Sequence, residues 1–268
     1  MPAAALVTAR TRVIFIIGAP ITQTRSPLLF NRYFTKAGVD RVVVPLVVRP
    51  DQVAAFLSVV RQASNCDGVI ATVPVKHSLF ALVEAPTERA RELEAVNVIR
   101  RDADGRLSGD MADGPGFWNA ASAHGFAPEG KRLALAGAGA AATAIAHEFA
   151  RRGGHHVSVA TSEPGEFDRL ARLLAGRIDL ASGMPEDLSG YDIAANATPL
   201  GMAHAPGTPF PRKLLASLPR RALVADAVSE PAETVLLAEA RTLGLATMAG
   251  DEMARGEFRL IGDFLGVL

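Results

Sequence analysis

One glycine-rich segment in the middle of the chain constrains the fold more than any other feature. Residues 137–142, GAGAAA, follow a strand-like apolar run, Arg132–Ala136, and open a predicted helix. This order of strand, G-x-G-x-x-G/A turn and helix is the dinucleotide-binding fingerprint. Gly137 permits the tight turn, Gly139 lets the backbone approach a pyrophosphate, and Ala142 keeps the helix close to the sheet. The segment predicts a Rossmann-type, doubly wound domain.

The first turn of the helix after these glycines is the predicted phosphate site. A helix start leaves backbone N–H groups unpaired and carries a partial positive charge, and here those groups belong to Ala140, Ala141 and Ala142. A glycine-rich turn alone is as often purely structural. The clear strand before it and the clear helix after it favour a nucleotide site.

The residue that reads the adenosine ribose is expected about 20 residues after the first glycine, at the end of the next strand. Thr161, Ser162 and Glu163 stand there, and Thr161 is assigned to the cofactor site. Glu163 is the candidate carboxylate for the ribose hydroxyls. An exposed loop acid that does not reach the ribose is an equally good interpretation of Glu163.

Hydrophobic periodicity predicts an α/β chain in two halves, the second beginning near Phe117. Predicted strands cover 13–17, 42–48, 68–73, 132–136, 157–160, 192–196, 222–227 and 245–248. Predicted helices cover 27–37, 52–61, 140–152, 166–174, 233–243 and 253–264. Asp51 is expected to cap the second helix, and Pro45 indicates either a sheet edge or an irregularity in its strand. Strands that alternate with helices predict mostly parallel sheets.

Charge and cysteine content exclude several classes of protein. The 28 basic and 28 acidic side chains cancel, so neither nucleic acid nor an anionic membrane is an expected partner. No apolar run is long enough to span a bilayer, and residues 1–12 lack a signal-peptide pattern. Cys66 is the only cysteine and is expected to be a small buried hydrophobe, which suits a cytoplasmic protein. The spacing of His147, His155 and His156 fits no metal site.

Eight segments of the chain, taken in order, resemble the motifs of the shikimate dehydrogenase family. They are 18–27 (GAPITQTRSP), 68–76 (GVIATVPVK), 95–99 (AVNVI), 109–116 (GDMADGPG), 137–142 (GAGAAA), 196–202 (NATPLGM), 226–234 (DAVSEPAET) and 250–253 (GDEM). Each motif is weak alone, but eight in the family's order cover essentially the whole chain from Val13 onward.

The resemblance implies a reversible hydride transfer between a nicotinamide and a ring secondary alcohol of a shikimate- or quinate-like hydroxy acid. It implies that Lys76 and Asp113 share the alcohol proton as general acid and base. It implies a substrate domain of residues 1–113 plus 250–268 and an NAD(P)-binding domain of residues 114–249. A monomer or a homodimer is expected.

The resemblance also assigns binding residues. It implies that Thr24 and Ser26 hold the substrate carboxylate and that ring hydroxyls are bound by Thr72 and Asn97. Glu257 stands where the family has a glutamine that binds a ring hydroxyl. The remaining implied cofactor residues are Thr198, Met202 and Gly250.

Several pocket positions depart from the family pattern. Thr24 replaces a serine, Ile70 and Met111 replace asparagines, Ser229 replaces a tyrosine, and Glu257 replaces the glutamine. A carboxylate only accepts hydrogen bonds, whereas an amide donates and accepts. The chemistry is therefore expected to be retained and the substrate recognition altered.

The cofactor is NADP by family resemblance, but NAD is also expected to serve. The family's arginine clamp for the 2′-phosphate is replaced by residues 161–163, TSE, which offer no guanidinium. We therefore expect relaxed selectivity, with NAD accepted at least comparably, unless another basic residue such as Arg169 binds the phosphate.

Two other classes of function remain open. A non-catalytic, dinucleotide-binding regulatory protein on the same fold would have no use for both Lys76 and Asp113. Taken singly, however, Lys76 reads as a surface charge and Asp113 as a turn aspartate. A different α/β enzyme, such as a methylene-folate or amino-acid dehydrogenase, would not explain the segment 24–26, TRS.

Overall fold

The computed structural model describes residues 7–268. The sequence prediction that residues 1–12 lack a signal-peptide pattern therefore lies partly outside the described residues. The chain divides into two compact units. Unit 1 holds the chain up to Ala112 and Phe258–Leu268, and unit 2 is Asp113–Glu257. The sequence placed Asp113 and residues 250–257 with the substrate domain instead.

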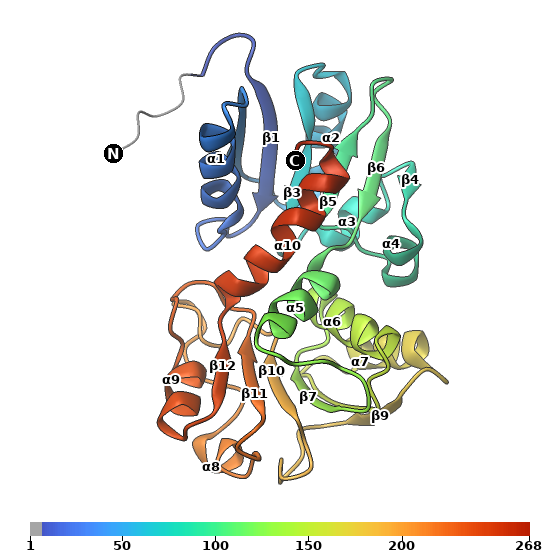
Figure 1. The fold of residues 1–268 in the computed structure, drawn as a ribbon. Helices are drawn as coiled ribbons and strands as arrows, with labels where there is room; N and C mark the ends of the chain where they lie inside the picture. The colour runs from blue at the N-terminus through green and yellow to red at the C-terminus, as the bar shows by residue number, and fades with distance from the viewer. Residues whose placement is uncertain (1–6) are drawn as a thin grey trace. The chain divides into compact units, whose positions relative to one another are not determined.

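Unit 1 is built on a six-stranded mixed sheet (Figure 1). Its strands are β1 (Arg12–Gly18), β2 (Arg41–Val47), β3 (Cys66–Ala71), β4 (Ala85–Pro86), β5 (Val98–Arg101) and β6 (Leu107–Asp110), in the order β2-β1-β3-β5-β6-β4. Its helices are α1 (Ser26–Ala37), α2 (Val53–Gln62), α3 (Lys76–Phe80) and α4 (Glu88–Leu93). Of the two alternatives predicted from Pro45, the sheet edge is confirmed, because β2 pairs only with β1 among the described strands.

The prediction of mostly parallel sheets is confirmed for this sheet with one exception, strand β5, since three of its five strand pairings are parallel. β1, β2 and β3 are parallel, but β5 runs antiparallel to both β3 and β6. β5 and β6 form a hairpin, closed by the Asp102 N–H donating to Arg106 O (2.8 Å). Gly105 supplies the positive φ (87°) that this turn requires.

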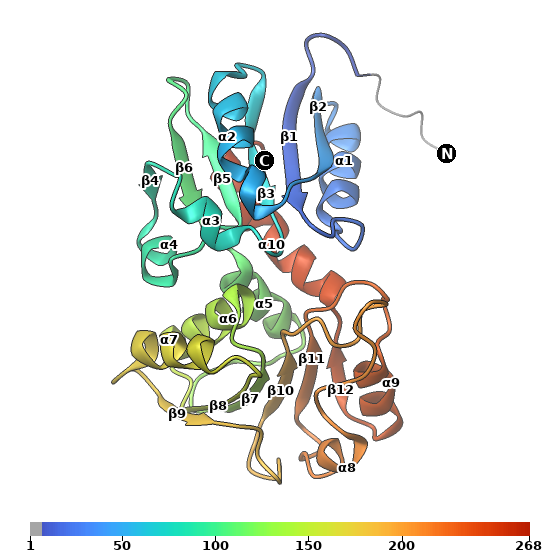
Figure 2. The same cartoon turned by 180° about the vertical axis from the view of Figure 1, so that it is seen from behind.

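Two helical layers cover the two faces of the unit 1 sheet. Figure 1 shows α1 and the end of α10 (Gly250–Leu265) on one face, and Figure 2 shows α2 and α3 on the other. Phe30 of α1 and Ile261 of α10 belong to the first core, and Leu57 of α2 belongs to the second. Asp51 does not cap α2: it lies in a 3₁₀ turn, Pro50–Gln52, and pairs with Arg49 at 3.4 Å.

Unit 2 holds a six-stranded sheet that is parallel throughout, as the sequence predicted for a Rossmann-type domain. Its strands are β7 (Arg132–Ala136), β8 (His156–Ala160), β9 (Asp179–Ser182), β10 (Ile193–Asn196), β11 (Leu223–Asp226) and β12 (Ala246–Met248). They lie side by side in the order β12-β11-β10-β7-β8-β9 (Figure 2). The chain order reverses between β7 and β10, which is the switch point where such sheets bind ligands.

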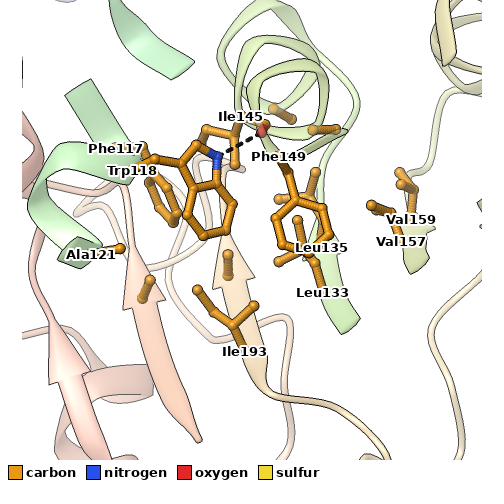
Figure 3. Packing of buried hydrophobic residues seen from close by; sticks show 14 of the residues in the cluster. Phe117, Trp118, Ala121, Leu133, Leu135, Ile145, Phe149, Val157, Val159 and Ile193 are labelled. Atoms are coloured by element: carbon orange, nitrogen blue, oxygen red, sulfur yellow. Dashed lines mark hydrogen bonds between the residues drawn. The ribbon is translucent and has the colours of Figure 1, made fainter. Parts of the chain in front are cut away.

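Helices cover both faces of this sheet. They are α5 (Asp113–Ala123), α6 (Ala140–Arg151), α7 (Pro164–Leu174), α8 (Arg212–Leu215) and α9 (Val235–Thr242), followed by the first half of α10. Figure 3 shows the larger core, where Trp118 of α5 stacks on Phe149 of α6 at 5.0 Å between ring centroids. The indole N–H of Trp118 donates to Ile145 O (2.9 Å), so the only polar atom of this ring is satisfied.

Small residues let α5 pack closely against the first half of α10. A Cβ on Gly256 would lie 2.1 Å from Gly116 O, and a Cβ on Gly116 would lie 2.2 Å from Glu257 Cγ. Side chains at either glycine would therefore push these helices apart. This packing explains why residues 250–257 belong with unit 2. Within residues 7–268, none of the helices is long and apolar enough to cross a membrane.

Candidate functional site

The predicted substrate residues of unit 1 gather where β1 and β3 end. The Thr72 N–H donates to Ile17 O (2.8 Å), which extends the pairing of the two strands. A Cβ on Gly18 would lie 2.4 Å from Thr72 Cγ2, so only glycine permits this approach. The loop after β1, which carries Thr24, and the loop after β3 therefore leave the same edge of the sheet.

Thr24 and Ser26 lie at the start of α1. Ser26 is the first residue of the helix and is half-buried. The Thr24 hydroxyl donates to Ile21 O (2.9 Å), which closes the turn before the helix. Thr24 therefore donates to a substrate carboxylate only if it gives up this bond, and until then its oxygen serves as an acceptor.

Lys76 and Asn97 lie close together in unit 1, near the edge where β1 and β3 end. Lys76 is the first residue of α3 and is only 7% exposed, so its ammonium is largely withdrawn from water. The Val96 N–H donates to Lys76 O (3.1 Å), which brings the residue before Asn97 against the lysine. Asn97 is buried, and its Oδ1 accepts from the Ala112 N–H (2.7 Å). Asn97 thus holds the backbone immediately before Asp113.

The two apolar departures from the family pattern have a packing role. Ile70 is 3% exposed and belongs to the core that α1 and the end of α10 form on the unit 1 sheet. Met111 is fully buried at the end of β6. Neither side chain offers a hydrogen bond, so both positions contribute to the core rather than to polar recognition.

In unit 2, the glycine-rich turn meets two other predicted cofactor segments. Gly137 adopts a φ of +103°, and its N–H donates to Ala160 O (2.7 Å), next to Thr161. A Cβ on Gly137 would lie 2.9 Å from Ala197 O and 3.2 Å from Thr198 Cγ2. Both the backbone conformation and the lack of space require glycine here. The turn thereby brings together the ends of β7, β8 and β10.

The start of α6 has the form expected of a phosphate site. Gly139 is the N-cap, and the first helical bond runs from the Thr143 N–H to Gly139 O (2.9 Å). The preceding N–H groups, those of Ala140, Ala141 and Ala142, point out of the helix end. This arrangement fits the pyrophosphate of a dinucleotide without any change of residue.

Glu163 fits the interpretation as a loop acid. It is exposed and forms the N-cap of α7, where its N–H donates to Thr161 Oγ1 (3.1 Å). A different carboxylate, which the sequence did not single out, lies at the glycine-rich turn: Glu166 Oε1 is 3.7 Å from the position of a Cβ on Gly139.

Asp113 and Glu257 both lie near the first turn of α5 in unit 2, Asp113 on α5 itself and Glu257 on α10. Asp113 begins α5 and is 2% exposed. Glu257 Cγ packs at the position of Gly116, one turn further along α5. On the same helix, α10, Arg255 pairs with Asp251 and Arg259 with Asp263.

Gly250, the first residue of α10, and Met202, which lies in a turn, both follow the carboxyl ends of unit 2 strands. A Cβ on Gly250 would lie 2.4 Å from Val228 O, so α10 begins directly against the loop after β11. Met202 lies in a turn after β10, where it bridges to Ala205. Gly201, just before it, has a φ of +105° that a side chain rarely adopts.

A buried carboxylate that the sequence reasoning assigned no role organises these loops. Asp226 is fully buried; its Oδ1 accepts from Asn196 Nδ2 and from the Val228 N–H, both at 3.0 Å. Its Oδ2 accepts from the Thr234 hydroxyl (2.6 Å), and Thr234 caps α9. Asn196 Oδ1 in turn accepts from the Thr198 hydroxyl (2.7 Å). Asp226 thus fixes the loops after β10 and β11 together.

Burial raises the pKa of Asp226 to about 6, although Thr234, Val228 and Asn196 all donate to its carboxylate. The folded protein therefore favours the protonated carboxyl. Its contribution to stability is fully present below the ordinary value of 3.8 and is lost as the pH rises through 6. A shift of this size corresponds to about 3 kcal/mol.

We expect Asp226→Asn to remove this pH dependence, because an asparagine occupies the same volume and does not titrate. The free energy of unfolding of the variant should rise relative to wild type by up to about 3 kcal/mol between about pH 4 and pH 7. Urea titrations at several pH values measure this. Asp187→Asn is the control: hydrogen bonds from Ser189 lower the pKa of Asp187, so its pH-dependent effect lies below the ordinary value of 3.8 and its difference from wild type should stay nearly constant from pH 4 to pH 7. A constant difference between Asp226→Asn and wild type would contradict the prediction.

Among residues 7–268, no group of three or more His, Cys, Asp or Glu side chains could hold a metal ion. His156 instead bonds to Asp179 (2.5 Å) and to Ser158 (3.0 Å) in unit 2. His147 is fully buried in α6 and lies 3.3 Å from Arg177.

Comparisons with known proteins agree with this architecture. Residues 16–99 match the family model of the shikimate dehydrogenase substrate binding domain. A shikimate dehydrogenase (NADP(+)) of Rubrobacter xylanophilus is 37% identical over 250 residues, which cover 91% of this chain and 86% of that protein. The same enzyme of Rhodospirillum rubrum is 37% identical over 261 residues, 91% of this chain and 88% of that protein. Among solved structures, the shikimate 5-dehydrogenase of Thermus thermophilus in complex with NADP(H) and shikimate has a TM-score of 0.84. It is 26% identical, with 96% of this chain and 94% of that chain covered.

Proposed function

The chain belongs to the shikimate dehydrogenase family, and we propose that it oxidises, reversibly, a ring secondary alcohol of a shikimate- or quinate-like hydroxy acid. It is an NAD(P)-dependent dehydrogenase that acts on a CH–OH group, as its relatives are named. These relatives are enzymes, so they give no support to the alternative of a regulatory protein.

The observation that carries this proposal is that both Lys76 and Asp113 are retained and buried, at 7% and 2% exposure. We propose that Lys76 takes part in moving the hydroxyl proton, away from the alcohol during oxidation and back to it during reduction. Asp113 is assigned as the other member of this acid–base pair.

The nicotinamide, when bound, accepts the hydride that leaves the same carbon, so the alcohol becomes a ketone. The residues proposed to hold the cofactor are Gly137, Gly139, Ala140, Ala141, Ala142, Thr161, Thr198, Met202 and Gly250. Their arrangement supports a nicotinamide dinucleotide as cofactor because the turn leaves room for a pyrophosphate and presents N–H donors to it. The relatives carry NADP(+) in their names, and NAD is retained as a second cofactor.

Unit 1 is proposed to bind the substrate. We assign the substrate carboxylate to Thr24 and Ser26, and the ring hydroxyls to Thr72 and Asn97. Thr72 is supported by its place at the edge where β1 and β3 end, together with Thr24's loop. Asn97 is buried in the same unit, and its Oδ1 accepts the Ala112 N–H.

The experiment that tests the function is a spectrophotometric screen. Purified protein is incubated with shikimate, quinate and related cyclic hydroxy acids, each with NADP⁺ and with NAD⁺, and the reduced nicotinamide is measured. Reduction with at least one of these acids is expected. A folded protein that binds the cofactor but reduces it with none of them would overturn the proposal in favour of a regulatory role.

We also propose that substrate recognition is altered through Glu257. An ionised carboxylate at a ring hydroxyl accepts a hydrogen bond but cannot donate one, and Ser229 lacks the bulky hydroxyl of the family tyrosine. The packing of Glu257 on the first turn of α5 supports this assignment, since that turn begins with Asp113.

Glu257→Gln is therefore expected to raise kcat/KM for shikimate by about tenfold, the equivalent of one regained hydrogen bond of about 1.4 kcal/mol. The matched control is Asp263→Asn, which removes a surface carboxylate that pairs with Arg259 on the same helix. Steady-state kinetics of the three proteins measure the effect. Equal values for Glu257→Gln and wild type, with high wild-type activity on shikimate, would show that Glu257 does not set specificity.

A cytoplasmic location is proposed from the single cysteine. Cys66 is 1% exposed, and burial raises the pKa of its thiol, so it behaves as a buried hydrophobe rather than a reactive group. A monomer or a homodimer stays a prediction.

A further inference from the structure

The carboxylate of Glu166 lies directly beside the glycine-rich turn of unit 2. Glu166 stands in the first turn of α7, which follows β8, and Gly139 is the N-cap of α6, which follows β7. A Cβ built on Gly139 has Glu166 Oε1 as its one neighbour within 4 Å among the described residues, at 3.7 Å. β7 and β8 are adjacent strands, so the two helix starts lie at one edge of the sheet.

Glu166 is not engaged in another interaction that would explain its position. Within residues 7–268, its side chain has neither a hydrogen bond nor an ion pair, and only its backbone N–H is bonded, to Glu163 O (3.0 Å). Arg169, the nearest cation along the helix, forms no ion pair with Glu166 within residues 7–268. The Nε atom of Arg169 is buried and has no hydrogen-bond partner among these residues. Among the described residues, no hydrogen bond or ion pair therefore accounts for the place of this carboxylate beside the turn.

This position is the one that the adenosine ribose takes in a dinucleotide site. The pyrophosphate rests on the helix start after the second glycine, and the ribose lies between that glycine and the end of the next strand. Gly139 is the second glycine here, and Glu166 approaches it from the segment that follows the next strand. Glu163, which occupies the sequence position expected for the ribose-reading acid, is exposed instead.

We infer that Glu166 is a specificity-determining residue of the cofactor site: it accepts a hydrogen bond from the ribose 2′-hydroxyl of NAD and repels the 2′-phosphate of NADP. The inference rests on the proposed function, because it takes the glycine-rich turn as the cofactor site. A 2′-phosphate carries most of two negative charges at neutral pH, and it is repelled by a carboxylate placed beside it. Glu166 shifts the balance of this chain towards NAD, compared with a chain that has a neutral side chain there.

Glu166 has a second electrostatic effect, which can be measured separately from its effect on the 2′ position. A carboxylate beside Gly139 also repels the pyrophosphate, which NAD and NADP share, and that repulsion weakens both cofactors by the same factor. The quantity that isolates the 2′ position is therefore the ratio of the two dissociation constants rather than either constant alone.

The test is a titration of the full-length protein with NAD⁺ and with NADP⁺ by isothermal calorimetry, without substrate. The proteins are wild type, Glu166→Gln and the matched control Glu163→Gln, which neutralises the exposed acid three residues earlier. We expect Glu166→Gln to raise affinity for NADP⁺ relative to NAD⁺ by about tenfold or more, and Glu163→Gln to leave the ratio near that of wild type. Circular dichroism confirms that each variant is folded.

Two outcomes would overturn the inference. The first is an unchanged ratio of dissociation constants in Glu166→Gln, including the case in which both cofactors bind more tightly by the same factor. The second is a shift of that ratio in Glu163→Gln as large as the shift in Glu166→Gln. An Arg169→Gln variant that alone loses NADP⁺ affinity would assign selectivity to that arginine instead. If folded wild type binds neither cofactor, the proposed function fails as well, so the two failures are told apart by the wild-type titration.

Discussion

Replacing Lys76 with alanine lowers kcat by about 10²–10⁴-fold, and replacing Asp113 with asparagine does the same, since this is the usual contribution of a positioned acid–base group. Each substitution removes one member of the proposed proton-transfer pair. Both side chains are buried, so solvent does not readily replace either one. Steady-state kinetics at saturating substrate and cofactor measure the loss.

Cofactor affinity serves as the internal control for these two variants. Neither residue belongs to the glycine-rich turn, so the dissociation constant of NADP⁺ should stay close to that of wild type. Lys36→Ala and Asp168→Asn, which alter exposed side chains of α1 and α7, should leave kcat unchanged. The acid–base assignment would be wrong if Lys76→Ala lost cofactor binding and yet turned over normally at saturation.

Replacing Trp118 with alanine lowers the free energy of unfolding of unit 2 by about 3–5 kcal/mol, the usual cost of removing a large buried aromatic side chain. Trp118 is fully buried, stacks on Phe149 and contacts Phe117 edge-on at 5.0 Å between ring centroids (Figure 3). Alanine leaves a cavity between α5, α6 and the sheet, because rigid secondary structure surrounds the site. Urea unfolding followed by circular dichroism measures the change, since Trp118 is the only tryptophan and its fluorescence is lost with it.

Trp118→Phe is the matched variant. It keeps an aromatic ring in contact with Phe149 but removes the indole N–H that donates to Ile145 O. A smaller loss, about 1–3 kcal/mol, is expected from the lost volume and the lost bond. Equal stability of Trp118→Ala and wild type would mean that this core does not hold α5 in place.

The local patterns of the sequence predicted the Rossmann half of the chain closely. The strand before the glycine-rich turn was predicted at 132–136 and is Arg132–Ala136, and the helix predicted at 166–174 is Pro164–Leu174. Such elements are set by neighbours along the chain: an apolar run, a glycine that needs positive φ, and a helical stripe of leucines. The same kind of signal located the turn at Gly137 and the helix that opens from residues 137–142 and was predicted to run to about Arg152.

Elements whose local sequence opposes their structure were missed. Helix α5 begins Asp113-Gly114-Pro115-Gly116, and two glycines with a proline are poor helix formers, so Asp113 could be read as a turn aspartate. Tertiary packing overrides this propensity. Gly114 faces Ala144 O and Gly116 faces Glu257, and in both places only a glycine lets the neighbouring helix approach.

The roles of Glu166 and Asp226 were decided by the tertiary structure alone. In the sequence, Glu166 is a surface-type residue of a predicted helix, and Asp226 is an acid at the end of a strand. Folding places the first beside Gly139 and surrounds the second with Asn196 and Thr234, which come from separate segments. A carboxylate's pKa and its partners depend on the groups and the solvent around it in space, and residues distant in the sequence supply those surroundings. The type and order of residues thus determined the chemistry available to this chain, and the fold decided which carboxylates are buried and which one lies at the cofactor turn.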